Sequence, residues 1–292
     1  MDERVLAERL IGYDTSRPDG IAAAQAFVKG WLESREITVT DVDHEGLPVL
    51  LADVGAPEGA PTVVLHGHID VVPAHEEQFT PKVEGDRLIG RGAYDMKGAL
   101  AAMMTVTAAM REQDRVRVRL AVVGDEESEE GDERGCDHLV DTGFLGDFAI
   151  TGEPTDLHIG VEAKGVLAMR LEVAGTAAHG ATPWLGDNAV LNAIDVFRSI
   201  ESLPFARHSS ELFDRPSINL GRIWGGDALN KVPDRCVIDV DIRYLPGQDP
   251  DAILAAVRAI DGVEATELLT RPPAMVSRES PFVQALRDAT AT

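Results

Sequence analysis

The stretch T-V-V-L-H-G-H-I-D, residues 62–70, joins an apolar run to a cluster of ionisable side chains. The run over residues 62–66 has the length and β-branched composition of a buried strand. His66, His68 and Asp70 lie at its end. Ionisable groups directly behind a buried strand are costly unless something pairs with them. We therefore expect a partner at this point, which can be a metal ion, a catalytic side chain or water.

Segments with helical and strand-like patterns alternate around this stretch up to residue 165. The patterns predict helices at 2–12, 21–34, 97–112 and 132–141, and strands at 36–42, 48–53, 62–66, 115–123 and 148–150. Strands that alternate with helices favour an α/β layer structure. The sequence therefore predicts an α/β domain with a mainly parallel sheet over residues 1–165.

The pattern changes after residue 165 to that of a smaller α+β domain. Apolar residues alternate over 166–173 and 236–243, as in a sheet with one exposed face. Helices are expected at 187–202 and 250–260, and a further strand near 263–269. The helix at 187–202 is expected to bury Val190, Ile194 and Phe197. The order resembles a ferredoxin-like β-α-β-β-α-β unit. We expect this domain to be inserted at 166–274, with residues 275–292 starting the return to the first domain.

The composition narrows the class of protein. The 292 residues carry a formal charge of −23, which argues against nucleic-acid binding through phosphate contacts. No apolar run is long enough to span a membrane, and the N-terminus does not resemble a signal peptide. Cys136 and Cys236 form no C-x-x-C pair, which fits a reducing compartment. We expect a cytoplasmic protein without nucleic-acid or membrane partners.

Three predicted strands of the first domain are each followed by metal-ligand residue types. His68 follows strand 62–66, Asp125-Glu126-Glu127 follows strand 115–123, and Glu153 follows strand 148–150. Ligands of parallel α/β sheets bind beyond the carboxyl ends of the strands. Carboxylates gathered there repel one another, and a divalent cation removes that repulsion. Mixed histidine and carboxylate ligands suit zinc or a similar first-row ion.

Further acids lie where they can reach the same edge of the predicted sheet. Asp95 lies in a glycine-rich loop that opens the helix at 97–112, and one carboxylate can bridge two metal ions. Asp70 is placed to accept the other ring N–H of His68 and so fix its tautomer. Of the adjacent Glu126 and Glu127, one can bind metal while the other takes a proton from water.

Five motifs resemble, in the same order, those of the di-zinc metallopeptidase family of acetylornithine deacetylase, succinyl-diaminopimelate desuccinylase, aminoacylase and glutamate carboxypeptidase. They are H-G-H-I-D-V-V-P, G-R-G-A-Y-D-M-K-G-A-L-A-A, G-D-E-E-S, T-G-E-P-T and A-A-H-G-A-T-P, between residues 66 and 183. The resemblance implies a zinc-peptidase-like catalytic domain with an inserted ferredoxin-like lid and dimerisation domain. It also implies two zinc ions, with cobalt or manganese as substitutes.

The same resemblance implies a role for each acid of the cluster. His68 binds one zinc ion, and Asp95 bridges both. Glu127 binds the other ion, Glu153 shares the ion of His68, and Glu126 is the general base and acid. The peptide bond that follows the bridging aspartate is expected to be cis.

Three residues of the predicted lid acquire roles in the same way. His179, in A-A-H-G-A, is expected to reach the active site of the partner in a homodimer and donate to the oxyanion. Asn230 assists there, and Arg243 binds a substrate carboxylate in a fork. Alternatives from the residues alone are that His179 caps a turn and that Arg243 pairs with Asp239 or Asp241.

One expected ligand is missing from these 292 residues. The family has a final zinc-binding histidine near its C-terminus, whereas no histidine follows His208 here. One zinc site therefore lacks its last histidine within this sequence. We expect a fragment of a longer chain, and the alternative is a naturally short, altered protein.

The function that follows is a cytoplasmic, dimeric, zinc-dependent amidohydrolase. We expect it to cleave the amide bond of small N-acyl amino acids in amino-acid biosynthesis, as a deacetylase or desuccinylase does, with activated water and a glutamate base. One alternative is a dipeptidase or carboxypeptidase of the same family. Another is a metal-poor dimeric binding protein without catalysis, since the last ligand is missing. The sequence does not define the acyl group or the amino acid.

Overall fold

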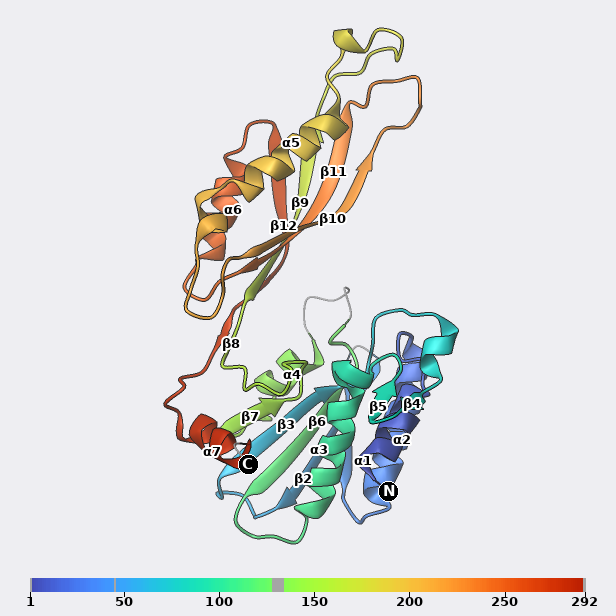
Figure 1. The fold of residues 1–292 in the computed structure, drawn as a ribbon, viewed down its shortest axis with the longest axis vertical. Coiled ribbons are helices and arrows are strands. Elements are labelled where there is room, and N and C mark those ends of the chain that lie inside the picture. Colours follow the sequence, from blue (N-terminus) through green and yellow to red (C-terminus); the bar gives the residue numbers. More distant parts are fainter. Residues whose placement is uncertain (1, 45, 128–133, 291–292) are drawn as a thin grey trace. The chain divides into compact units, whose positions relative to one another are not determined.

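The computed structural model describes residues 2–44, 46–127 and 134–290. The chain divides into two compact units, Met1–His158 and Ile159–Thr292 (Figure 1). The sequence places the boundaries of the inserted domain at 165/166 and 274/275, and those boundaries stay predictions. Among the described residues, no helix has the length and apolar character needed to cross a membrane.

The first unit combines four α-helices with a five-stranded main sheet. The helices are α1 (Glu3–Ile11), α2 (Pro18–Glu33), α3 (Gly98–Ala109) and α4 (Gly135–Asp141). The strands of this sheet are β1 (Val39–His44), β2 (Leu47–Gly55), β3 (Thr62–His68), β6 (Arg117–Val123) and β7 (Phe148–Thr151). A small hairpin of β4 (Lys82–Glu84) and β5 (Arg87–Ile89) lies between two short helical segments, η1 (Glu76–Phe79) and η2 (Ala93–Lys97). The α/β class predicted from the sequence is confirmed.

The main sheet is mixed, and one strand runs against the other four. Its strand order is β1-β2-β6-β3-β7; β6, β3 and β7 are parallel neighbours, and β2 pairs antiparallel with both β1 and β6. The linker between β1 and β2 is too short for a crossover, so these two strands form a hairpin. The parallel part carries the polar stretch quoted above, because β3 lies between β6 and β7.

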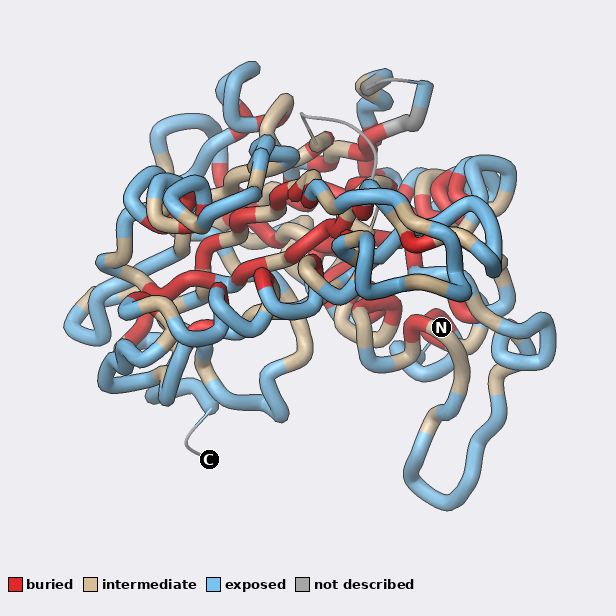
Figure 2. The backbone as a smooth tube through the Cα atoms, turned by 90° about the horizontal axis from the view of Figure 1, so that it is seen from above, coloured by how far each residue is buried: buried red, intermediate tan, exposed pale blue. Residues whose placement is uncertain are grey.

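Apolar side chains from both faces of this sheet form the core of the first unit. Leu65 and Leu120 lie side by side in β3 and β6, and Leu100 and Met104 of α3 are fully buried. Helices α1 and α2 add Leu6 and further residues to the same cluster. In Figure 2 the buried, red positions run through the inner segments of the trace, whereas loops are pale blue. The strand ends that carry the acids are therefore held by a rigid core.

The second unit is built on a four-stranded antiparallel sheet. Its elements are β8 (Glu162–Ala163), β9 (Gly165–Ala174), η3 (Pro183–Leu185), α5 (Ala189–Glu201), η4 (Pro204–Arg207), β10 (Ser217–Gly225), β11 (Arg235–Tyr244), α6 (Pro250–Arg258), β12 (Val263–Arg271), β13 (Ala274–Met275) and α7 (Pro281–Thr290). The order in the sheet is β10-β11-β9-β12, so the unit follows β-α-β-β-α-β. Strand β10 was not predicted, because this edge strand has little buried surface and no regular apolar alternation.

One face of this sheet is buried as predicted, but helix α5 is rotated relative to its prediction. Alternate residues of β9 and β11 are buried under the helices: Leu167, Met169, Leu171, Val173, Cys236, Ile238, Val240 and Ile242. In α5 the fully buried positions are Ala189, Ala193 and Ile200, whereas Ile194 is 38% exposed. Val190 and Phe197 pack at the margin of this core. The buried face of α5 is therefore shifted from the predicted one to Ala189, Ala193, Val196 and Ile200.

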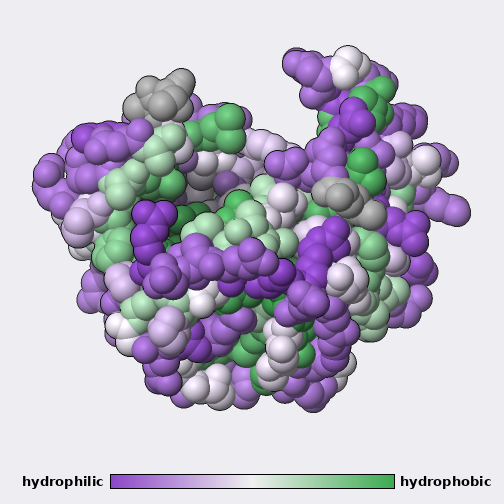
Figure 3. Space-filling model, turned by 90° about the horizontal axis from the view of Figure 1, so that it is seen from below, coloured by the Kyte–Doolittle hydropathy of each residue, from purple (hydrophilic) through white to green (hydrophobic). Residues whose placement is uncertain are grey.

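Hydrophilic residues, drawn in purple, cover much of the face shown in Figure 3. This agrees with the formal charge of −23. Large apolar side chains that remain exposed in the second unit include Trp184, Leu185, Leu191 and Leu229. Exposed apolar side chains often mark protein interfaces, and the contact with a second copy of the chain is expected in this same unit.

Candidate metal centre

His68 is the last residue of β3 and lies at the centre of the candidate site. The strand extends two residues further than the sequence predicts, so His68 still pairs in the sheet, opposite Val123 of β6. Its side chain is fully buried. Its main-chain N–H points at the sulfur of Met96, 3.4 Å away, which ties the strand end to η2. The imidazole is therefore fixed by the sheet on one side and by the glycine-rich loop on the other.

Two acids that are distant in sequence meet the Nε2 atom of His68. Asp95 Oδ1, from η2, lies 3.0 Å from Nε2. Glu153 Oε1, from the loop after β7, lies 3.7 Å from the same atom. One ligand atom of each of these three residues lies within 4.8 Å of the others. The structure thus brings together the three side chains that the resemblance assigns to one zinc ion.

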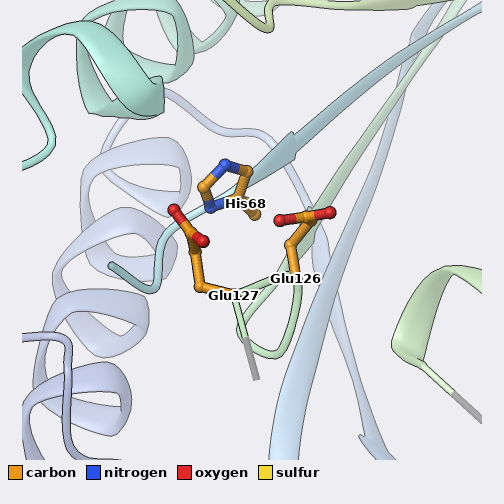
Figure 4. A group of neighbouring side chains, drawn as sticks. All are labelled: His68, Glu126 and Glu127. Carbon is orange, nitrogen blue, oxygen red and sulfur yellow. The ribbon is translucent and has the colours of Figure 1, made fainter. Parts of the chain in front are cut away.

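A second group of three also contains His68. Glu126 and Glu127, from the loop after β6, direct their carboxylates toward the imidazole (Figure 4). Their ligand atoms and a ring nitrogen of His68 lie within 4.8 Å of one another. Both groups therefore share His68, and the acids predicted from three separate loops do converge on one point.

Asp70 orients the site through its main chain as well as its side chain. The Nδ1 atom of His68 lies 3.0 Å from the main-chain oxygen of Asp70 and 3.4 Å from its Oδ1. Asp70 Oδ2 accepts a hydrogen bond of 2.7 Å from the main-chain N–H of Glu127. The shorter contact makes the carbonyl the better acceptor for the ring N–H. The carboxylate holds the loop that carries Glu127.

The electrostatics of the cluster favour a bound cation. Burial alone would lower the pKa of His68, but the carboxylates of Asp70 and Glu153 outweigh it and raise the pKa to about 11. Burial raises the pKa of Asp95, and the neighbouring Glu153 carboxylate raises it further. Burial also raises the pKa of Glu127. One imidazole shared by several carboxylates is a donor set that a divalent first-row ion fits.

Glu126 is held by the start of α4. Burial raises the pKa of Glu126, and the guanidinium of Arg134 opposes this shift. Arg134 Nη1 lies 2.8 Å from Glu126 Oε1 and also donates to the main-chain oxygen of Glu126. The neighbouring Asp125 accepts a hydrogen bond of 2.6 Å from the N–H of Gly135. Asp125 is therefore a structural acid that anchors this loop, a role the sequence analysis did not assign.

Two buried residues near the site were missed from the sequence. Lys97 is fully buried, its Nζ donates to the main-chain oxygen of Tyr13 at 2.9 Å, and burial lowers its pKa to about 8. Thr15 is also fully buried and donates to the main-chain oxygen of Ile69 at 2.7 Å. A lysine at the start of an apolar helix is the one signal that could have indicated the contact between Lys97 and Tyr13, because lysine is rarely buried without a partner.

The second unit carries the three residues assigned to the predicted lid. His179 and Asn230 lie together on neighbouring segments: the Gly180 N–H donates to the Asn230 main-chain oxygen at 2.7 Å. His179 Nδ1 accepts from the N–H of Ala181 at 3.0 Å, so this histidine does cap a turn. Its side chain is exposed, as is that of Asn230.

Arg243 has an acidic neighbour on its own strand. Its Nε atom lies 2.9 Å from Asp241 Oδ2, which is one of the two pairings considered from the sequence. The other acid, Asp239, pairs instead with Arg170 through two contacts of 2.8 Å. The proposed fork to a substrate carboxylate stays a prediction.

Two further expectations concern a peptide bond in the glycine-rich loop and the start of a helix. The Asp95–Met96 peptide bond is cis, as the resemblance implies. Helix α4 begins at Gly135; the first residues of the predicted helix at 132–141, Asp132 and Glu133, lie outside the described residues.

The fold and the site together define a class of protein: a two-unit α/β protein with a candidate metal centre at the edge of a sheet. Residues 64–292 match the model of peptidase family M20/M25/M40. A succinyl-diaminopimelate desuccinylase of Gluconobacter oxydans (strain 621H) is 33% identical over 265 residues, covering 83% of this chain and 68% of that protein. A probable carboxypeptidase of Emericella nidulans is 30% identical over 270 residues, covering 82% and 63%.

Solved structures share the fold at lower identity. An M20 family metallo-carboxypeptidase of Sulfolobus solfataricus has a TM-score of 0.76 at 19% identity, covering 99% of this chain and 83% of that chain. The aminopeptidase PepT of Bacillus cereus has a TM-score of 0.73 at 19% identity, covering 100% and 82%. This chain belongs to peptidase family M20/M25/M40. Its aligned part covers only 68% and 63% of the two curated relatives.

Proposed function

We propose that this protein is a metal-dependent hydrolase that cleaves the amide bond of small N-acyl amino acids. The observation that carries the proposal is the convergence on His68 of carboxylates from three loops, namely Asp95, Glu153 and the Glu126–Glu127 pair. Family membership supports a divalent metal there. The substrate class rests on the 33% identical relative that is named a succinyl-diaminopimelate desuccinylase.

The residues of the first unit divide the work of such a reaction. His68, Asp95 and Glu153 would hold one metal ion, and Glu127 together with Asp95 would hold a second. Bound zinc polarises a carbonyl and acidifies water. Glu126 takes the proton from the attacking water and returns it to the leaving amine. Burial suits Glu126 to this task because it raises the pKa of the carboxyl toward the working range of a base.

The second unit would complete the site in a homodimer formed through residues 166–274. His179, supplied by the partner copy, would donate to the oxyanion, and Asn230 would assist it. Their common position on adjoining segments supports a joint role. Arg243 would exchange its contact with Asp241 for the carboxylate of the substrate.

The substitution Glu126→Gln tests the proposed base. It keeps the size of the side chain and a hydrogen-bond acceptor, but it cannot take up a proton. We expect it to retain bound zinc and to lower kcat for N-succinyl and N-acetyl amino acids by about 10²–10⁴-fold. Zinc is measured by atomic absorption, and turnover by release of the free amine.

A matched control is Glu84→Gln, which changes an exposed glutamate of β4 in the same unit. It should leave both zinc content and turnover unchanged. Normal turnover in Glu126→Gln would show that this glutamate is not the base. Loss of zinc from the same variant would show that Glu126 binds metal instead.

Peptide hydrolysis is a second candidate function. The 30% identical relative is named a probable carboxypeptidase, and a solved structure of the same fold is a metallo-carboxypeptidase. Unblocked dipeptides assayed beside the acylated amino acids discriminate the two. A higher kcat/KM for dipeptides than for acylated amino acids would show that the protein is a peptidase with the same site and not a deacylase.

A further inference from the structure

The segment between α1 and α2, residues 13–15, is fixed from both sides. Gly20 of α2 lies so close that a Cβ atom there would be 1.7 Å from the Asp14 main-chain oxygen. Asp14 accepts a hydrogen bond of 2.6 Å from the Ser16 hydroxyl and lies 3.1 Å from Arg17. The backbone of this segment, called here the Tyr13–Thr15 loop, therefore has little freedom.

This loop contacts the strand end that carries His68. The Thr15 hydroxyl donates to the main-chain oxygen of Ile69 at 2.7 Å, between His68 and Asp70 in the sequence. The Thr15 main-chain oxygen accepts from the N–H of Val71 at 3.2 Å. Thr15 and Ile69 are fully buried, so water cannot replace a lost hydrogen bond.

The same loop contacts the segment that carries Asp95. Lys97 Nζ donates to the main-chain oxygen of Tyr13 at 2.9 Å, and Lys97 is fully buried. One short loop thus links two segments that are far apart in sequence and that meet at the His68–Asp95 contact of 3.0 Å.

We propose that the Tyr13–Thr15 loop is a positioning element for the metal centre, with Thr15 as its principal residue. Metal affinity depends on ligands being held in place before the ion binds, and partners outside the ligand set supply this order. The inference rests on the proposed function, since it requires a metal ion at His68 and Asp95.

The test compares Thr15→Val with Thr107→Val. Both substitutions keep the shape of a fully buried threonine and remove a hydroxyl that donates to a main-chain oxygen, to Ile69 in one case and to Met103 within α3 in the other. Zinc affinity is measured by competition with a chromophoric chelator. We expect Thr15→Val to weaken it about 10–100-fold and Thr107→Val to leave it unchanged.

Two further readouts separate positioning from general stability. The visible spectrum of the cobalt-loaded protein reports ligand geometry, and it should change only in Thr15→Val. Urea unfolding of the metal-free proteins should show similar losses for both valine variants. Thr15→Ser, which keeps the hydroxyl, should restore affinity and spectrum. If Thr15→Val does not fold, Ser16→Ala loosens the loop more mildly and should also weaken zinc binding.

The outcomes are distinct. Wild-type zinc affinity and cobalt spectrum in Thr15→Val, or in Ser16→Ala where that variant is used, would overturn the positioning role while leaving the metal site in place. Equal weakening by Thr107→Val would overturn it too. An unaltered protein that binds no zinc would overturn the proposed function and this inference together.

Discussion

His68 and Asp70 illustrate which contacts a sequence reveals at the scale of single residues. Alternate residues at a strand end project to the same side, so the spacing of H-x-D already predicts that the two side chains meet. The structure brings them together, with the main-chain oxygen of Asp70 nearer to the ring than its carboxylate. The choice between these acceptors depends on the backbone path after β3, which residue spacing does not contain.

Other contacts at this scale could not be predicted because they join distant segments. Thr15 and Lys97 contact main-chain oxygens rather than side chains, so no complementary pair of residue types marks them. Arg134 reaches Glu126 only because α4 starts beside the loop after β6. Residue types in the sequence predicted which side chains can bind a metal ion. The residues that hold those side chains in place are determined by tertiary packing.

Gly165 gives a prediction at the same scale. A Cβ atom at this position would lie 2.2 Å from the ring of Tyr244, whose hydroxyl donates to the Arg271 main-chain oxygen at 2.9 Å. Tyr244 is buried in the core of the second unit and cannot move without breaking that contact. Gly165→Ala should lower the free energy of unfolding by about 1–3 kcal/mol through overpacking. Urea denaturation measures the change.

Gly30→Ala is the matched control for that substitution. Gly30 lies within α2, and an added Cβ atom would have no neighbour within 4 Å. Alanine there should raise the free energy of unfolding by about 0.4–1 kcal/mol, since it restricts the unfolded chain. A free energy of unfolding of Gly165→Ala that equals or exceeds that of Gly30→Ala would contradict the packing described for Tyr244.

At the scale of elements, the period of the apolar residues predicted where the strands lie better than it predicted which elements pack beside them. The alternation in 166–173 correctly predicts the buried face of β9, because a strand with one wet face has a period of two. The antiparallel pairing of β1 with β2 agrees with the short gap between the predicted strands 36–42 and 48–53, which excludes a parallel crossover. The buried face of α5 was misassigned because Ala189 and Ala193 share it with Val196 and Ile200, and alanine is a weak marker of a buried face.

Helix α5 also leads to a prediction about assembly. Leu191 is 63% exposed on this helix, and Trp224 is 49% exposed on the edge strand β10. Exposed apolar residues of this kind favour a protein interface, and we place the proposed homodimer contact there. Light scattering should give twice the chain mass of 31.4 kDa, and Leu191→Asp should shift the protein to monomer.

The control for that experiment lies in the first unit. Val106 of α3 is 48% exposed, and Val106→Asp should leave the dimer intact. A monomeric unaltered protein, or a dimer that is insensitive to Leu191→Asp, would contradict a contact through α5.

At the scale of the whole molecule, the order of the motifs predicted more than the composition did. The order of five motifs predicted the family, and the family match over residues 64–292 confirms it. The charge of −23 does not distinguish among the hydrolases of that family. The acyl group and the amino acid depend on contacts that neither the motifs nor the described residues define.

The proposed function requires a divalent metal ion at His68. Anomalous diffraction at the zinc absorption edge from zinc-loaded crystals tests it most directly. We expect a peak about 2.0–2.2 Å from His68 Nε2 and from carboxylate oxygens of Asp95 and Glu153. Zinc found only at other residues, or no anomalous peak beside His68 at saturating zinc, would show that this site does not hold the ion.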